Sequence, residues 1–474
     1  MNGKLLKDLS ANTLQMIITQ VCGLIIFYVL SVFFSKNDFG EINWSLAILL
    51  TAFSILSLGI DQLVVKKIAE GISPPIMLSV YFLHVMLTGC LFYLALLLVH
   101  FAFPGFHHQL LLFLGIGKLM IFFASPFKQL ANGLEKFRLL LYMSVCSNIV
   151  RSILLIVFAF LGNLSLPLVV IIFIGGDVCE FILSLALSKI ILKIPLTVTV
   201  SKTSYLNLLK ESLPQAGVVI FTSAIARFDW IFLGILASNI ALAEYSFAFK
   251  VFEVASLPLL VIAPILIPRF TRIFHPSSTA DLSAKQSALA VLFRFEMIVS
   301  SLVALVLNIL WVPVIDHITH NKYGAVNRNT IFILSACMPF IYANNFLWTI
   351  NFAKGKLKMI FYIFLSTFLV NVIIDIILIP GFGGEGAAIG YLLAVATQFF
   401  LFRIKTNIDS FRKNDYAILI CPLAAFVSGI LVNQFIADTV AALFTSIVSF
   451  FFLLIFSRQI ILGNWSHIKR ITEF

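Results

Sequence analysis

Two side chains able to bind a small cation, Asn371 and Asp375, stand four residues apart in an apolar stretch of the chain. Residues with this spacing lie on one face of a helix. A carboxylate within an apolar span is costly to expose to lipid, so it is expected to face water, a partner charge or an ion. Amide and carboxylate oxygens are the ligands that hard cations prefer. The pair therefore predicts a site for Na⁺ or a proton inside the protein.

Asp229 is a third candidate ligand of the same site. At a rise of about 1.5 Å per residue, Asn371 lies roughly 21 Å from the cytoplasmic end of its expected helix, Asp375 roughly 27 Å and Asp229 roughly 24 Å. The three side chains are therefore predicted at one level. Alternatively, the two aspartates form ion pairs with Arg227 and Lys250, which fall at similar depth. The sequence leaves both readings open.

Four basic residues within apolar stretches are candidates for binding an anion. Lys118 and Arg151 fall in the first half of the chain, and Arg227 and Lys250 in the second. An arginine can contact two phosphate oxygens at once, so a cavity lined by these residues suits an anionic headgroup. The alternative is pairing with the acidic residues Asp177, Glu180 and Glu253, and the three-residue spacing of Lys250 and Glu253 favours such a pair.

Further ionisable residues lie in the apolar stretches. Each costs roughly 2.5 to 3.5 kcal/mol at the centre of a membrane helix. A wet interior or mutual pairing is therefore required. These further residues are Asp61, Asp177, Glu180, Arg294 and Glu296.

The composition shows that membrane helices must carry these residues. The chain is 61% hydrophobic, only 11% charged and contains 49 Phe. A soluble domain could not bury so much apolar surface. Apolar runs of 18 or more residues predict an all-α polytopic membrane protein. Fourteen transmembrane helices are predicted, over residues 11–35, 42–65, 76–102, 110–131, 139–161, 166–188, 213–237, 243–268, 287–312, 329–352, 357–380, 386–404, 416–435 and 438–460.

The distribution of positive charge predicts the orientation of these helices. The formal net charge is +11. When the N-terminus is placed inside, only Lys36, Lys322 and Arg328 fall in loops on the outer side. This asymmetry follows the positive-inside rule and predicts that both termini are cytoplasmic. The short loops leave no domain for a basic nucleic-acid surface, so nucleic acid is not expected as a partner.

Weak internal repetition predicts two halves of six helices each. Residues 6–8 resemble 209–211, and residues 136–138 resemble 356–358. An even number of helices gives both halves the same orientation, so the repeat is parallel, about an axis along the membrane normal. The predicted organisation is an N-terminal six-helix bundle at 1–192, a cytoplasmic linker at 193–212, a C-terminal six-helix bundle at 213–404, and two further helices with a tail at 405–474.

The segment 371–390 carries a family resemblance. Its helix with Asn371 and Asp375 reaches Pro380, and a glycine-rich turn leads into the sequence GAAIG from Gly386 to Gly390. This pattern resembles the multidrug/oligosaccharidyl-lipid/polysaccharide exporter superfamily, and within it the O-antigen-type oligosaccharide flippases. Weaker similarities in the stretches 9–40, 132–151 and 245–272 extend the resemblance over essentially the whole chain.

The resemblance implies two six-helix bundles arranged as a V in a bacterial cytoplasmic membrane. It implies a flippase that moves a polyprenyl-pyrophosphate-linked oligosaccharide, the repeat unit of an O-antigen, capsule or exopolysaccharide, to the outer leaflet by alternating access. A polysaccharide polymerase or other assembly proteins would be its partners. In a related flippase of lipid-linked peptidoglycan, Na⁺ binds at positions that match Asp229, Asn371 and Asp375. A threonine of that site is matched here by Tyr391, a departure that leaves the ion's identity open.

Two other functions remain as alternatives. A cation-coupled multidrug exporter has the same architecture, but a cavity for organic cations needs acidic rather than basic residues. A membrane glycan polymerase or acyltransferase needs a large outer loop or a buried histidine with polar partners. The chain offers only the segment 313–328 and His84, which is expected to be a hydrogen-bonded core residue. We therefore predict a transporter rather than an enzyme, with no cofactor and no metal site beyond a coupling ion.

Overall fold

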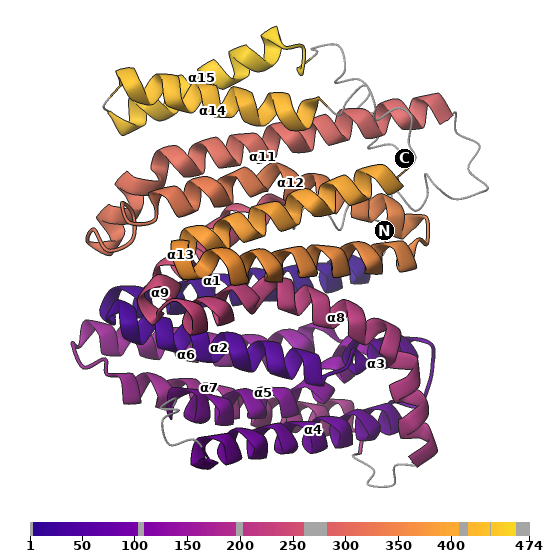
Figure 1. Ribbon diagram of the computed structural model, residues 1–474. Coiled ribbons are helices and arrows are strands. Elements are labelled where there is room, and N and C mark those ends of the chain that lie inside the picture. The colour runs from indigo at the N-terminus through magenta and orange to yellow at the C-terminus, as the bar shows by residue number, and fades with distance from the viewer. Residues whose placement is uncertain are drawn as a thin grey trace. The chain divides into compact units, whose positions relative to one another are not determined.

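The computed structural model describes residues 3–102, 109–195, 202–259, 282–406, 416–436 and 438–460 (Figure 1). Every regular element in these ranges is a helix. The chain divides into two compact units, Met1–Gly234 and Ile235–Phe474. The predicted boundaries at 192 and 213 differ from this division and remain predictions about the repeat.

The first unit is built around one central helix, α5 (Gln109–Gly133), which packs against α2, α3, α4, α6 and α7. Helix α8 lies along the same unit, because Trp44 Nε1 donates to the Ile231 carbonyl at 3.3 Å and Lys67 forms an ion pair with Glu211 at 2.6 Å. The other elements are α1 (Gly3–Phe33), α2 (Lys36–Leu56), α3 (Ile60–Ala69), α4 (Pro74–Ala102), α6 (Phe137–Phe160), α7 (Leu166–Leu187), the π-helical turn η1 (Ser188–Leu192) and α8 (Lys202–Leu236).

The second unit is organised around the adjacent helices α11 and α12. Helix α12 packs against α9 and α13, and α11 packs against α14 and α15, which lie beside it in Figure 1. The elements are α9 (Asn239–Ala255), α11 (Leu282–Thr319), α12 (Arg328–Ala353), α13 (Leu357–Lys405), α14 (Ala417–Phe435) and α15 (Thr439–Phe456).

Nine helices within the described ranges are long and apolar enough to cross a membrane. Two shorter apolar helices, Ile17–Phe33 and Ala417–Val432, add to them. The all-helical, many-span architecture is as predicted, whereas the count of fourteen helices remains a prediction.

Three predicted boundaries are corrected by the structure. The expected span 42–65 breaks at Leu58 and Gly59, which both have positive φ (49° and 69°). The expected linker 193–212 becomes helical from Lys202. The expected outer loop 313–328 is shorter, because α11 continues to Thr319.

Helix α13 is a helical hairpin rather than one straight rod. Its only residue with non-helical backbone angles is Gly383, at φ 53° and ψ −127°, so the turn is tighter than the sequence suggested. A Cβ atom on Gly386 would run into the Leu378 carbonyl group, at 2.6 Å from its oxygen. The two arms of the hairpin therefore approach closely just beyond the turn, as a residue without a side chain permits.

Candidate functional site

A cluster of buried charges occupies the first unit between α5, α6 and α7. Asp177 of α7 lies between two cations: Lys118 Nζ donates to its Oδ2 at 2.9 Å, and Arg151 Nη2 contacts its Oδ1 at 2.6 Å. All three residues are buried. The predicted anion-binding residues Lys118 and Arg151 are therefore brought together, and both are already engaged by an acid.

Glu180 extends this cluster by one helical turn. Its carboxylate accepts from Lys128 Nζ at 2.7 Å and from the Ser147 hydroxyl at 2.5 Å, and it lies 3.4 Å from Arg151 Nη2. Because Asp177 and Glu180 are three residues apart, they share one face of α7. Arg151 thus links the two acids, and charges alternate through the group. We call Lys118, Lys128, Arg151, Asp177 and Glu180 the charged cluster.

The charged cluster has one more cation than acids. Its three basic groups face two carboxylates, which leaves a formal charge of +1 in a buried setting. Cations that are already paired tolerate burial better than isolated ones. The arrangement can therefore keep an excess positive charge inside the protein, where it would attract an anion strongly.

Two glycines make room for the charged cluster. A Cβ atom on Gly117 of α5 would lie 2.5 Å from Asp177 Oδ2, and one on Gly176 of α7 would overlap the side chain of Arg151. The helices can therefore approach closely enough for short ion pairs. The neighbouring Gly175 faces open space, so a Cβ atom there meets nothing within 4 Å.

We expect Gly176→Ala to destabilise the protein by about 1 to 3 kcal/mol, the usual cost of overpacking a core. The added methyl group would push Arg151 away from Asp177. Thermal unfolding of the purified protein in detergent measures the effect. Gly175→Ala is the matched control and should be neutral or slightly stabilising, because alanine favours helix more than glycine does. Equal melting temperatures for the two variants would contradict this role of Gly176.

The second unit holds the predicted pair Asn371 and Asp375. Both are fully buried, and Asn371 Nδ2 donates to Asp375 Oδ2 at 3.1 Å. The side-chain amide oxygen of Asn371, Oδ1, has no hydrogen-bond partner among the described residues. Thr367, one turn earlier and buried, continues the same polar face. This set of oxygens fits a small hard cation.

Gly390 lies opposite this pair on the second arm of the hairpin. A Cβ atom there would overlap Asp375 Oδ1 and would lie 3.6 Å from Asn371 Nδ2. The next residue, Tyr391, packs its ring edge-on against Phe249, with ring centroids 5.6 Å apart. The hairpin fold therefore explains why the glycine turn and the Asn371–Asp375 pair occur in one segment of sequence.

Three other predicted site residues have different settings. Asp229 is fully buried on α8 and belongs to the first unit, so its membership of the Asn371–Asp375 site remains a prediction. The Arg227 guanidinium lies over the Trp230 ring, 4.9 Å from the ring centroid. Lys250 pairs with Glu253 at 2.8 Å, as their spacing favoured.

His84 has the satisfied core environment that was expected of it. Its Nδ1 lies 3.0 Å from the Tyr205 hydroxyl, and its Nε2 lies 2.8 Å from the Leu56 carbonyl oxygen. Both ring nitrogens are engaged in hydrogen bonds that tie α4 to neighbouring segments. These contacts give His84 a structural role between α4 and its neighbours.

Sequence reasoning missed several residues of these two sites. Lys128 lies inside the predicted span 110–131 and was available as an intramembrane cation. Gly176 could have been noticed beside Asp177 in the sequence GGD. Ser147 and Thr367 carry no signal in the sequence, because hydroxyl groups in membrane helices commonly bond to their own backbone.

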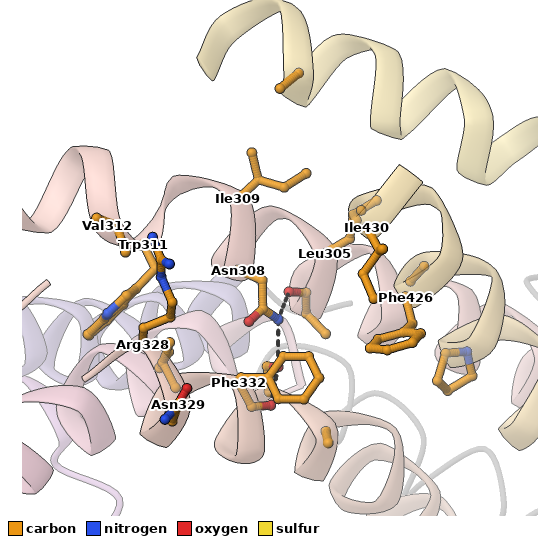
Figure 2. A pocket seen from close by; sticks show the side chains of 18 of the residues that line it. Leu305, Asn308, Ile309, Trp311, Val312, Arg328, Asn329, Phe332, Phe426 and Ile430 are labelled. Atoms are coloured by element: carbon orange, nitrogen blue, oxygen red, sulfur yellow. Dashed lines mark hydrogen bonds between the residues drawn. The ribbon is translucent and has the colours of Figure 1, made fainter. Parts of the chain in front are cut away.

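A cavity of about 960 Å³ lies in the second unit between α11, α12, α14 and α15 (Figure 2). Most of its wall is apolar, including Leu305, Phe332 and Phe426. Asn308 donates to the Ser335 hydroxyl at 2.6 Å and to the Ala304 carbonyl at 2.8 Å. These polar groups stand on the α11–α12 side of the cavity, as Figure 2 shows for Asn308.

Comparison with solved structures identifies the fold. The structure titled lipid II flippase MurJ, inward closed conformation, matches with a TM-score of 0.74 and 15% identity, over 94% of this chain and 98% of that chain. An inward-facing multidrug resistance MATE family transporter of the MOP superfamily matches with a TM-score of 0.60 and 12% identity, over 85% and 99%. A point mutant of the Vibrio cholerae MATE transporter VcmN matches with a TM-score of 0.59 and 13% identity, over 87% and 98%.

These matches define the class: the chain has the fold of the MOP superfamily of membrane transporters. The family described as "Polysaccharide biosynthesis protein" matches residues 5–274. The chain belongs to that polysaccharide biosynthesis protein family, and the predicted superfamily is thereby confirmed. No curated protein matches the sequence. Together with the apolar helices, the fold and the family make the chain an integral membrane protein.

Proposed function

We propose that the protein is a flippase that moves a polyprenyl-pyrophosphate-linked oligosaccharide from the cytoplasmic to the outer leaflet of a bacterial inner membrane. The charged cluster is the observation that carries this proposal. A buried excess of positive charge suits the one strongly anionic part of such a lipid, its pyrophosphate. Membership of the polysaccharide biosynthesis family supports the glycan as the other part of the cargo.

The pyrophosphate is received by exchange of partners within the charged cluster. Arg151 carries the planar guanidinium that matches two phosphate oxygens, and Lys118 and Lys128 supply further charge. Their bonds to Asp177 and Glu180 hold them in place while the site is empty. Arg227 and Lys250 are proposed as additional contacts with the same group.

Transport follows the alternating access common to transporters with internal repeats. The prenyl tail stays in lipid while the sugars pass through a wet interior. Outward movement of negative charge is favoured by an inside-negative potential, by about 2.3 kcal/mol per charge per 100 mV. Inward Na⁺ or H⁺ bound at Asn371 and Asp375, with Asp229 as a third ligand, resets the cycle.

The biological setting follows from the same proposal. The glycan is the repeat unit of an O-antigen, a capsule or an exopolysaccharide, and both termini of the protein are cytoplasmic. Fourteen transmembrane helices, two bundles of six and two C-terminal helices, complete this picture, together with a polysaccharide polymerase or other assembly partner.

A multidrug exporter is the second candidate function, because solved MATE transporters share the fold. The charged cluster disfavours cationic drugs as its cargo, since its net charge is positive. The buried acids Asp229 of the first unit and Asp375 of the second are the residues that would suit such cargo instead.

Reconstituted vesicles test the two functions directly. We expect the purified protein to move a fluorescent polyprenyl-pyrophosphate glycan between leaflets and to leave cationic dyes in place. Movement of the dyes without movement of the lipid-linked glycan would replace the flippase with a drug exporter. Vesicles without protein provide the background for both assays.

A further inference from the structure

Glu296 of α11 is a buried acid that the proposed transport cycle does not use. It is 1% exposed. Within the described ranges, neither of its carboxylate oxygens has a hydrogen-bond partner, and no cation forms an ion pair with it. Asp177 and Glu180, in contrast, each contact two cations. Glu296 therefore has a different electrostatic environment from the charged cluster.

The surroundings of Glu296 are mostly apolar. Phe293, one turn earlier on the same helix, packs against Phe346 of α12, with ring centroids 5.5 Å apart. Tyr342, one turn before Phe346, interacts electrostatically with Glu296. The packing of Phe293 and the electrostatic interaction with Tyr342 place Glu296 on the side of α11 that faces α12.

Titratable groups on the other helices packed against α11 have other partners. Cys421 of α14 interacts with Arg294, two residues before Glu296. Lys250 of α9 pairs with Glu253. Helix α15, which also packs against α11, contains no ionisable side chain. Among the described residues, Glu296 therefore forms no ion pair with a cation.

The chemistry of this environment selects a proton as the ligand. A metal ion such as Na⁺ needs several oxygen ligands. Among the described residues, no hydrogen-bonding group lies on the Glu296 carboxylate to help form such a ligand set. An isolated carboxylate in an apolar interior costs far more than a neutral carboxylic acid, and such a group usually neutralises instead. A proton satisfies Glu296 without further ligands.

One buried hydroxyl group lies on α11 between Glu296 and the cavity of Figure 2. Ser300 and Ala304 follow Glu296 at intervals of four residues, which keeps them on nearly one face of α11. Ala304 already lines the cavity, about 12 Å along the helix from Glu296. Ser300 is fully buried between them, and its hydroxyl donates to the Met297 carbonyl at 3.0 Å, which leaves its oxygen able to accept a further hydrogen bond.

We infer that Glu296 is a proton-binding site, separate from the Asn371–Asp375 pair, and that it exchanges its proton with the cavity past Ser300. The proton enters where α11, α12, α14 and α15 surround the cavity. It then passes along the α11–α12 interface and binds a carboxylate oxygen that faces Tyr342. This proposal does not depend on which cargo the protein carries.

Infrared spectroscopy of the purified full-length protein at neutral pH tests the site. We expect the wild type to show the carbonyl stretching band of a protonated carboxyl group, and we expect Glu296→Gln to lose it. Glu253→Gln is the matched control and should keep the band, because Glu253 is paired with Lys250. A spectrum in which Glu296→Gln loses only a carboxylate signal would overturn the proposal. Failure of Glu296→Gln to fold would overturn it too, because the neutral isostere should replace the protonated acid.

The route has its own test. The same band shifts when the bound proton is exchanged for deuterium, so its time course in D₂O reports access to Glu296. Ser300→Val removes the hydroxyl with little change in volume, and we expect it to slow the exchange several-fold. Ser446→Val, at a buried serine on α15, is the control and should leave the rate unchanged. An unchanged rate in Ser300→Val would overturn the route.

Discussion

Arg151→Ala is expected to abolish export of the lipid-linked glycan. The substitution removes the group that contacts both Asp177 and Glu180, and it leaves two lysines facing two acids. The excess positive charge of the charged cluster disappears. Each charge-assisted hydrogen bond to a phosphate that is lost weakens binding by about 1.5 to 3 kcal/mol. Transport in vesicles, measured with a fluorescent lipid-linked glycan, should fall at least about tenfold.

Controls must separate this effect from misfolding. Breaking a buried ion pair costs about 3 to 5 kcal/mol, so the Arg151 variant is also expected to unfold at lower temperature. Lys128→Ala keeps the Arg151–Asp177 pair and should lose transport with a smaller loss of stability. Arg138→Ala, on the same helix but exposed, should behave like the wild type. Full export by a folded Arg151→Ala protein would remove Arg151 from the mechanism.

Asp375→Asn is expected to eliminate stabilisation of the protein by its coupling ion. An ion at 100 times its dissociation constant stabilises the folded state by about 2.7 kcal/mol. For a unit of this size, that corresponds to a rise of about 5 to 10 °C in melting temperature. Melting curves with Na⁺ and with a matched organic cation, and at several pH values, measure the shift and distinguish Na⁺ from H⁺. In the Asp375→Asn variant, ion binding at this site should no longer make the melting temperature depend on Na⁺ or on pH.

Gly390→Ala tests the same site without altering a ligand. Its methyl group would overlap Asp375 Oδ1, so we expect the ion-dependent shift to be lost. Gly381→Ala, on the same hairpin, adds a methyl group with nothing within 4 Å and should keep the full shift. A full ion-dependent shift of the melting temperature in Gly390→Ala would show that Asn371 and Asp375 do not bind the coupling ion. The absence of any shift in the wild type, with Na⁺ or with protons, would show the same.

Much of the fold could be predicted because a membrane imposes strong rules on sequence. An apolar run long enough to cross the hydrocarbon core identifies a membrane helix, and the polar residues between two runs identify where the helices end. Asn371 and Asp375 were found because a carboxylate is rare in such a run, and the structure confirms that the two lie together. The break at Leu58 and Gly59 was missed, because apolar residues continue through it and hide the change of backbone angle.

The choice between bound cargo and internal pairing was open from the sequence. Lys118 and Arg151 suggested a ring of cations, and Asp177 and Glu180 were the competing partners. The structure shows that these charges contact one another, so the pyrophosphate that we propose as cargo would exchange with these acids rather than enter an empty cationic pocket. Helical spacing relates residues on one helix, but these contacts join three different helices.

The sequence alone determined that this chain is a helical membrane protein with charged residues inside the membrane. Both conclusions depend only on local composition, namely on the length of each apolar run and on the free-energy cost of a charged residue within it. It also placed Asn371 and Asp375 on one helix face. The tertiary structure decided which charges meet, through close helix approaches at Gly117, Gly176 and Gly390. A glycine leaves space for a charged side chain of another segment only when that segment packs against it. This packing depends on contacts between residues that are far apart in the sequence.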